Sequence, residues 1–324
     1  MVLTSPASKS SFVWREPSMS PNPQVKTIGS SSIAAILGLS PWAGPWDVWA
    51  RMQGLTKSTS TRATLRGHIL EPAIADYYAG QMGCALTPGP AYEEKPIIGP
   101  EAWMHARPDR FAQDKDNTWL VEIKSTRTFK KGWGEPGTAD IPQYYAAQCL
   151  WQMAVTGHSR TDLAAFATIS DEFRVYRIHR DMKLEKQIVD YVRDWYTKYI
   201  TGDTPPDIDD TKGCAQALAQ YFKQTSEEFV DPSEDDKAMA SDLASIRDQI
   251  ASLEAERRSK ENLLKERVGE HKGIFGICTW SAVKPRVTVD SKALKNEQPD
   301  VYEKYSKTGQ PGRQFRFIYQ QEEQ

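Results

Sequence analysis

Three charged residues, close together in the chain, have the side-chain types that phosphodiester hydrolysis requires. Asp109 lies in "RPDRF", and Glu122 and Lys124 lie in "LVEIKST", which begins eleven residues after Asp109. Side chains of a strand alternate between its two faces, so Glu122 and Lys124 share one face while Ile123 points into the core. If "AQDKDNT" is a turn between antiparallel neighbours, Asp109 lies beside Glu122. Both carboxylates and the Ile123 carbonyl would then offer oxygen ligands to Mg²⁺ or Mn²⁺.

This spacing has two interpretations. In the first one, Lys124 lies within reach of a metal-bound water and orients or deprotonates it for attack on a phosphodiester. In the second, Glu122 and Lys124 are an incidental ion pair on a half-exposed strand. Because acids and a lysine at these intervals arise by chance in many charged chains, the spacing alone favours the incidental pair.

Two further segments carry polar groups in apolar surroundings. Glu71 in "RGHILEP" follows Ile69 and Leu70, where a carboxylate is costly unless it is paired or bound to a metal. Tyr145 and Gln148 in "YYAAQCLWQM" are three residues apart and therefore share one helix face. The plain alternatives are a surface glutamate and an amide that bonds a neighbouring loop.

The elements that must position these residues follow from apolar periodicity and turn signals. We expect short helices at "GSSSIAAILG", ended by Gly38, and at "PWDVWARM". Longer helices are expected over 62–82, with a kink or break at Pro72, over about 140–156 and over 182–200. The predicted strands are "EEKPIIG", "MHARPDRFAQ", "TWLVEIKST", "DLAAFATI" and "EFRVYRIHR". This order of helices and strands predicts an α/β domain with a mixed sheet.

The remainder of the chain has a different character. A polar linker is expected at 201–210, then a helix at "TKGCAQALAQYFKQ" and a long charged helix over 233–268. Its apolar residues step by four and three, a heptad seam that fits a local helical hairpin or an intermolecular coiled coil: Met239, Leu243, Ile246, Ile250 and Leu253. The basic tail that follows is predicted to hold strands around a small helix.

Composition excludes several classes of protein. The 324 residues are 39% hydrophobic with a net charge of −2, which argues against a nucleic-acid coat protein but not against an enzyme with a local basic patch. No apolar run reaches the roughly 20 residues of a membrane span, and no signal peptide is expected. The cysteines are too far apart for a zinc ribbon or an iron–sulfur site and indicate a reducing cytoplasm: Cys84, Cys149, Cys214 and Cys278.

Five motifs in this order resemble the YqaJ viral recombinase family, the phage-lambda-type alkaline exonucleases of the PD-(D/E)XK nuclease superfamily. They are "GSSSIAAILGLSPW", "RGHILEP", "PDRF", "EIK" and "IPQYYAAQCLWQMAVTG". The resemblance covers roughly residues 26–200, and the tail from "VDSKALKNEQPDVYEKY" to "GRQFRF" is similar to that of longer phage members. It implies a restriction-endonuclease-like core with a mixed central sheet flanked by helices. We therefore divide the chain into a flexible leader (1–25), a nuclease domain (26–204) and a helical/β extension (205–324) with a long charged helix and a small basic tail.

The resemblance also implies roles for individual residues. Asp109 and Glu122 match the metal-binding acids and Lys124 the catalytic lysine. Glu71 matches the helical acid near the metals, and Gln148 the glutamine that supports the lysine and the attacking water. The residues expected to contact DNA are Ser31, Arg66, Tyr145, Lys26, Arg127 and Lys131.

Two positions qualify this assignment. Three consecutive serines leave the position of Ser31 open by one residue, and Lys26 and Arg66 are both candidates for the 5′-phosphate site. The family usually has Asp-Gly where this chain has Asp109-Arg110. That difference removes a flexible turn but keeps Asp109, the expected metal-binding carboxylate.

The function implied is a Mg²⁺-dependent exonuclease, with Mn²⁺ as a substitute, that degrades linear double-stranded DNA from 5′ to 3′. It would leave 3′ single strands for a single-strand-annealing recombinase, act as a homo-trimer, and work in the cytoplasm of a bacterial host as a phage or prophage product. One rival is an inactive DNA-binding or assembly protein on the nuclease fold. The other is an endonuclease or repair nuclease with the same active site.

Overall fold

The structure is a computed structural model that describes residues 25–57, 61–91, 94–202, 204–307 and 314–319. The expected flexible leader lies outside these residues except for Val25. Internal contacts divide the chain into two compact units, Met1–Phe222 and Lys223–Gln324, which are considered separately.

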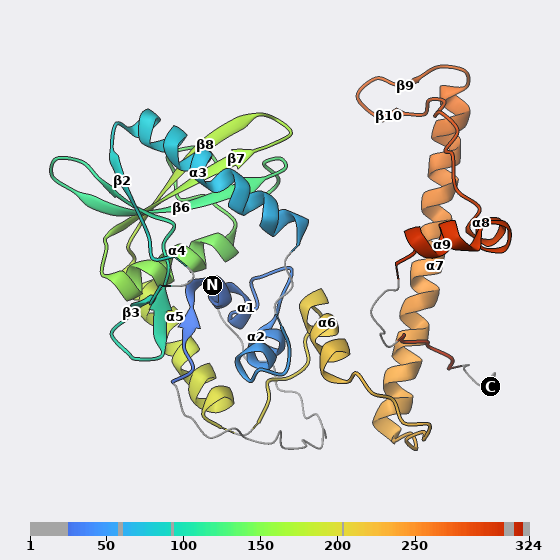
Figure 1. Cartoon of the computed structure of the whole chain (residues 1–324), viewed down its shortest axis with the longest axis horizontal. Coiled ribbons are helices and arrows are strands. Elements are labelled where there is room, and N and C mark those ends of the chain that lie inside the picture. Colours follow the sequence, from blue (N-terminus) through green and yellow to red (C-terminus); the bar gives the residue numbers. More distant parts are fainter. Residues whose placement is uncertain (1–24, 58–60, 92–93, 203, 308–313, 320–324) are drawn as a thin grey trace. The chain divides into compact units, whose positions relative to one another are not determined.

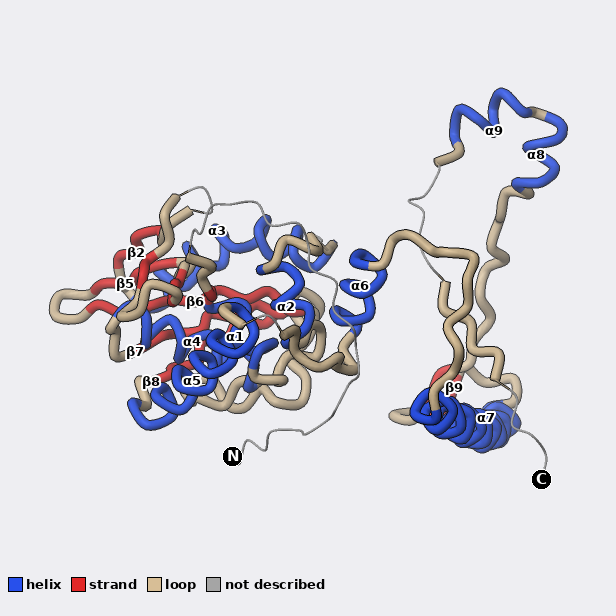
Figure 2. Tube along the Cα trace, turned by 90° about the horizontal axis from the view of Figure 1, so that it is seen from below, coloured by secondary structure: helices blue, strands red, loops and turns tan. Residues whose placement is uncertain are grey.

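A five-stranded mixed sheet forms the centre of the first unit (Figures 1 and 2). Its strands stand in the order β2-β5-β6-β7-β8, with β6 and β7 parallel and the other neighbours antiparallel. The bounds are β2 Ala85–Pro88, β5 Arg110–Gln113, β6 Thr118–Thr126, β7 Arg160–Ala167 and β8 Glu172–His179. The predicted α/β class with a mixed sheet flanked by helices is therefore confirmed.

The alternation of β6 separates two apolar layers. Val121 and Ile123 pack with Ile74 and Tyr78 of α3 (Arg62–Met82) on one face of the sheet. Leu120 belongs to the core on the other face, which includes most of α4 (Gln143–Thr156). The helices α3 and α4 thus cover opposite faces (Figure 2). Because Glu122 and Lys124 alternate with Val121 and Ile123, their side chains lie on the α4 face.

Smaller elements surround this core. A second sheet has the order β1-β4-β3, and helices pack beside α4 and around it. The bounds are β1 Ile28–Gly29, α1 Ser30–Ile36, α2 Pro45–Met52, β3 Ile97–Ile98, β4 Met104–Ala106, α5 Met182–Trp195, a π-helical turn Tyr196–Ile200 and α6 Lys212–Tyr221. Cys214 and Ala217 of α6 are buried in the main core. The compact unit therefore extends beyond residue 204, where the sequence placed the end of the nuclease domain.

Proline accounts for two departures from the expected elements. The segment "MHARPDRFAQ" forms two strands in different sheets, β4 and β5, because Pro108 between them has no N–H for a ladder. Conversely, α3 continues through Pro72, so the helix does not break there, and the alternative of a kink stays a prediction. Pro72 is exposed, and the helix beyond it is held by Ile74 and Tyr78, which are buried against the sheet.

The second unit is built around α7 (Glu234–Val268), which begins with a capping box between Ser233 and Asp236. A hairpin of β9 (Gly273–Ile274) and β10 (Cys278–Thr279) precedes α8 (Ser291–Glu297) and α9 (Pro299–Tyr305). Four seam residues of α7 are at least half exposed: Met239, Ile246, Ile250 and Leu253. Their pairing, in a hairpin or a coiled coil, stays a prediction. No helix among the described residues is long and apolar enough to cross a membrane.

Candidate active site

The hairpin of β5 and β6 brings Asp109 to the middle of β6. The two strands are antiparallel, with Arg110 opposite Val121, so the expected neighbour relation is confirmed. The pairing of β6 with β5 ends at Val121. The next N–H of β6 that points toward β5, that of Ile123, therefore has no partner in β5. Asp109 accepts it at 2.7 Å through Oδ2. The N–H and C=O of one strand residue point to the same side, so the Ile123 carbonyl also faces the Asp109 side of β6.

Glu122 is buried, with 1% of its surface exposed, and three side chains donate to its carboxylate. Gln148 Nε2 donates to Oε1 at 2.6 Å and Gln152 Nε2 donates to Oε2 at 2.7 Å. Lys124 Nζ donates to the same Oε1 as Gln148. A buried carboxylate needs this number of donors to remain charged at an acceptable cost. Both glutamines come from α4, which covers this face of the sheet.

Gln152 is a site residue that sequence reasoning missed. It lies four residues after Gln148 and therefore on the same face of α4. The two amides at this spacing in an otherwise apolar helix were the available signal. Gln152 is fully buried, whereas Gln148 is partly exposed.

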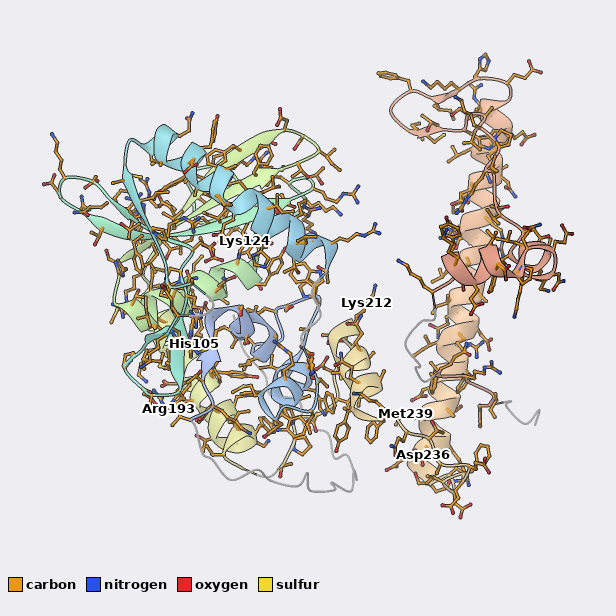
Figure 3. The ribbon with its side chains drawn as sticks, viewed as in Figure 1. His105, Lys124, Arg193, Lys212, Asp236 and Met239 are labelled. Carbon is orange, nitrogen blue, oxygen red and sulfur yellow. The ribbon has the colours of Figure 1, made fainter. Side chains whose placement is uncertain are left out.

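Lys124 contacts both the Glu122 carboxylate and an aromatic ring; Figure 3 labels Lys124 in the first unit. Its Nζ lies 5.3 Å from the centroid of the Tyr145 ring. Burial lowers the pKa of Lys124, but the charges of Glu122 and Asp109 outweigh it and hold the pKa above its ordinary value. The side chain is therefore a cation at neutral pH, suited to orient a water or a phosphate oxygen.

The two carboxylates repel each other. Burial and the charge of Glu122 raise the pKa of Asp109 to about 8, although Lys124 opposes the shift. The two carboxylates therefore cannot both be ionised at neutral pH unless a cation neutralises them. A hard divalent cation fits this donor set of Asp109, Glu122 and the Ile123 carbonyl. No group of three or more His, Cys, Asp or Glu side chains in the described part of the chain forms a metal-binding cluster.

Glu71, the third acid, is held by a different partner. Arg110 Nη1 donates to Glu71 Oε1 at 2.8 Å and to the Asp109 carbonyl at 2.6 Å. Arg110 stands at the position where the resembled family usually has glycine. The structure therefore places Glu71 near the carboxylate pair but joins it to a guanidinium. Sequence reasoning identified Arg110 as a difference and did not identify its partner.

The residues expected to contact DNA are distributed over several elements. Tyr145 lies at the site, against Lys124. Arg66 lies on α3, and its Nε is buried with no hydrogen-bond partner among the described residues. Lys26 donates to Gln53. The other three are exposed: Ser31, Arg127 and Lys131.

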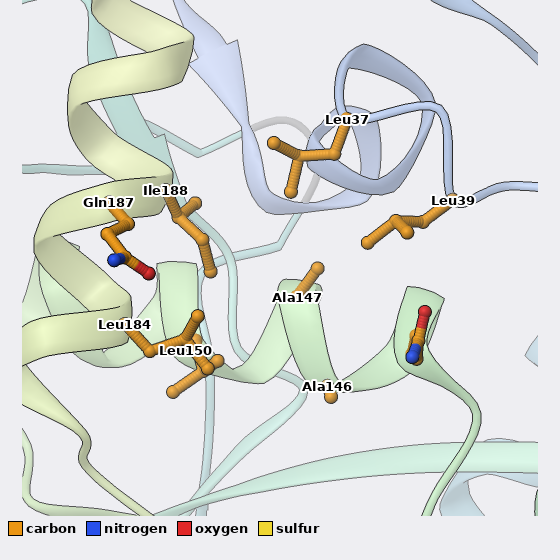
Figure 4. A pocket seen from close by; sticks show the side chains of 9 residues that line it. Leu37, Leu39, Ala146, Ala147, Leu150, Leu184, Gln187 and Ile188 are labelled. Atoms are coloured by element: carbon orange, nitrogen blue, oxygen red, sulfur yellow. The ribbon is translucent and has the colours of Figure 1, made fainter. Parts of the chain in front are cut away.

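The opposite face of α4 is apolar. Ala146, Ala147 and Leu150 line a cavity of about 200 Å³ that Leu184 and Ile188 of α5 close from the other side (Figure 4). Apolar packing on that face holds α4 in place and so positions the amides on its other face. The cavity is separate from the carboxylates, which lie on the sheet side of the helix.

Replacing Gln152 with leucine is expected to lower the free energy of unfolding by about 1–3 kcal/mol, because a buried carboxylate oxygen loses its donor. Gln148→Leu provides a matched control, since water can replace the amide at a partly exposed position and its cost should be smaller. Chemical denaturation followed by circular dichroism measures both. Equal midpoints for Gln152→Leu and the wild type would show that this hydrogen bond is not stabilising.

Comparison with known proteins gives a consistent set of relatives. Residues 22–159 match the family model of the YqaJ-like viral recombinase domain. The uncharacterized protein YqaJ of Bacillus subtilis (strain 168) is 24% identical over 292 residues, which cover 87% of this chain and 88% of that protein. The resemblance drawn from the five motifs is confirmed by these matches.

Solved structures of exonucleases also match part of the chain. LHK-Exo in complex with dAMP is 26% identical with a TM-score of 0.43, over 55% of this chain and 89% of that one. LHK-Exo is described as an alkaline exonuclease from Laribacter hongkongensis. A phage-related exonuclease from Haemophilus somnus 129PT is 14% identical with a TM-score of 0.39, over 54% of this chain and 95% of that one.

Proposed function

We propose that this chain, which carries a YqaJ-like viral recombinase domain at residues 22–159, is a metal-dependent exonuclease acting on linear double-stranded DNA. One observation carries the proposal. Asp109, Glu122 and Lys124 converge at one place on β6, and Gln148 and Gln152 fix the buried carboxylate. An incidental surface ion pair would not require two amides from another helix.

Each residue has a defined task in this proposal. Asp109, Glu122 and the Ile123 carbonyl would hold a divalent cation, which when bound supplies an activated water and neutralises charge on the phosphate. The Ile123 N–H orients Asp109. Lys124, a cation beside both carboxylates, orients the water or a phosphate oxygen and stabilises the negative charge that develops during attack. Glu71 supports the site through Arg110, which bridges it to the backbone of Asp109.

The finer features of the proposal rest on the resemblance of the five motifs. They are Mg²⁺ as the metal with Mn²⁺ as a substitute, 5′ to 3′ polarity, and 3′ single strands handed to a single-strand-annealing recombinase. A homo-trimer around DNA and action in the cytoplasm of a bacterial host, as a phage or prophage product, belong to the same proposal. Lys26 and Arg66 are the two candidates for the 5′-phosphate contact in this proposal.

A comparison of linear and circular DNA tests the activity. With Mg²⁺, the protein is expected to shorten a linear plasmid progressively and to leave the same plasmid intact as a closed circle, because an exonuclease needs an end. Gel electrophoresis over time measures both, and EDTA should stop the reaction. Equal cutting of circles would favour the endonuclease, and no cutting of either form would favour an inactive DNA-binding protein.

A further inference from the structure

A row of aromatic rings leads from the candidate active site to the protein surface. The Tyr145 ring, next to Lys124, lies 4.4 Å from the Tyr144 ring, and the Tyr144 ring lies 5.0 Å from that of Trp42. These are distances between ring centroids, and both contacts are edge-to-face. The row therefore runs from Tyr145, beside Lys124, through Tyr144 to Trp42.

Trp42 differs from most tryptophans of this chain. Its side chain is 59% exposed, and among the described tryptophans only Trp280, in the second unit, is also more than half exposed, at 51%. Six others are buried: Trp46, Trp49, Trp103, Trp119, Trp151 and Trp195. Exposure of so large an apolar ring beside a polar site indicates a binding surface more than a core position.

The backbone of Trp42 is fixed although its ring is exposed. Ser40 Oγ accepts the N–H groups of Trp42 and Ala43, both at 3.3 Å. The Trp42 carbonyl accepts the N–H of Gly213 at 2.9 Å. A side chain at position 213 would meet that carbonyl at 2.7 Å, so α6 approaches the loop this closely because residue 213 is glycine. The loop that carries Trp42 is thus fixed, and the ring itself contacts Tyr144.

We propose that Trp42 and Tyr144 form a stacking platform for unpaired bases of the DNA strand next to the scissile phosphate. This inference rests on the proposed nuclease function and adds a subsite to it. Aromatic side chains stack on any base, because every base has a π-face. Bases inside a duplex already have both faces covered, so such a platform selects a terminal or unpaired base.

The position of the carboxylates supports unpaired bases as the ligand. Glu122 is 1% exposed, so a bulky duplex does not reach its carboxylate without separation of its strands. A single strand is thinner than a duplex and needs less room to bring its phosphate there. Tyr144, in the first turn of α4, lies next to Tyr145 and thus close to Lys124.

Fluorescence of 2-aminopurine tests the platform with the full-length chain in EDTA, which blocks cleavage. The probe is a short single strand, or a duplex with a frayed end, that carries 2-aminopurine at its last base. Stacking on Trp42 should quench the probe on binding. Trp42→Ala should remove most of the quenching and weaken single-strand binding roughly five- to tenfold, whereas Trp42→Phe should retain both. Trp280→Ala, the matched exposed tryptophan, should behave like the wild type.

The outcomes separate this inference from the nuclease proposal. Suppose that the wild type cuts linear duplex and that Trp42→Ala binds the probe and quenches it to the same extent as the wild type. The proposed stacking platform is then wrong, and the nuclease proposal stands. If the wild type neither binds nor cuts DNA, the nuclease proposal itself fails. A melting curve for each variant excludes unfolding as the cause, and retained binding by Trp42→Phe assigns the effect to the ring.

Discussion

Replacing Lys124 with alanine is expected to reduce cleavage of linear duplex DNA by roughly 10³-fold, within the range seen when a positioned catalytic group is removed. The substitution removes the cation that donates to Glu122, and no other lysine or arginine among the described residues donates to that carboxylate. Glu122 keeps the two amide donors from α4, so the fold should persist. A gel assay with Mg²⁺ measures the rate.

Lys115→Ala is the matched control for this variant, because Lys115 is an exposed lysine in the turn between the same two strands. It should retain full activity. Circular dichroism and DNA binding in EDTA should be nearly unchanged for both variants, which separates loss of chemistry from loss of structure. Full activity of Lys124→Ala would mean that the catalytic site lies elsewhere in the molecule.

The core of the site is predictable from sequence because it depends on local rules. Strand alternation places Glu122 and Lys124 on one face, and the short turn after β5 makes β5 and β6 antiparallel neighbours. The position of Asp109 beside β6 follows from these two rules alone. Each of these steps uses residues close together in the chain, so periodicity and turn chemistry are sufficient.

Contacts that join distant segments were not predictable in the same way. The pair of Glu71 with Arg110 requires the packing of α3 against the sheet, which periodicity does not encode. The split of "MHARPDRFAQ" depends on which sheet each half joins, a choice made by tertiary packing. The role of Gln152 follows only once α4 lies over Glu122.

Asp162 is the clearest example of a residue whose environment the sequence does not reveal. It begins the predicted strand "DLAAFATI", where an acid suggests an exposed strand end. In the structure it is fully buried, and its partners come from α3 and from both strands β7 and β8. Tyr78 donates to Asp162 at 2.7 Å, Arg160 Nε at 2.8 Å and Arg177 Nε at 3.3 Å.

Replacing Asp162 with alanine is therefore expected to lower the free energy of unfolding by about 3–5 kcal/mol, because it leaves buried donors and a guanidinium without their acceptor. Asp190→Ala is the control: Asp190 also pairs with two basic residues, but its side chain is 41% exposed. An exposed pair of this kind contributes about 0–1 kcal/mol. Chemical denaturation measures both variants.

The effect of Asp162→Ala should also depend on pH. Burial alone would raise the pKa of Asp162, but hydrogen bonds from Arg160 and Tyr78 outweigh it and hold the pKa below its ordinary value. A carboxylate with a depressed folded-state pKa stabilises the protein above the unfolded-state pKa, near 3.9, and loses that contribution as the pH falls through the folded-state value. The stability gap between wild type and Asp162→Ala should therefore be largest at neutral pH and narrow in acid. A gap that stays constant down to the lowest pH at which the protein folds would mean that lost packing, and not the buried charge network, sets the cost.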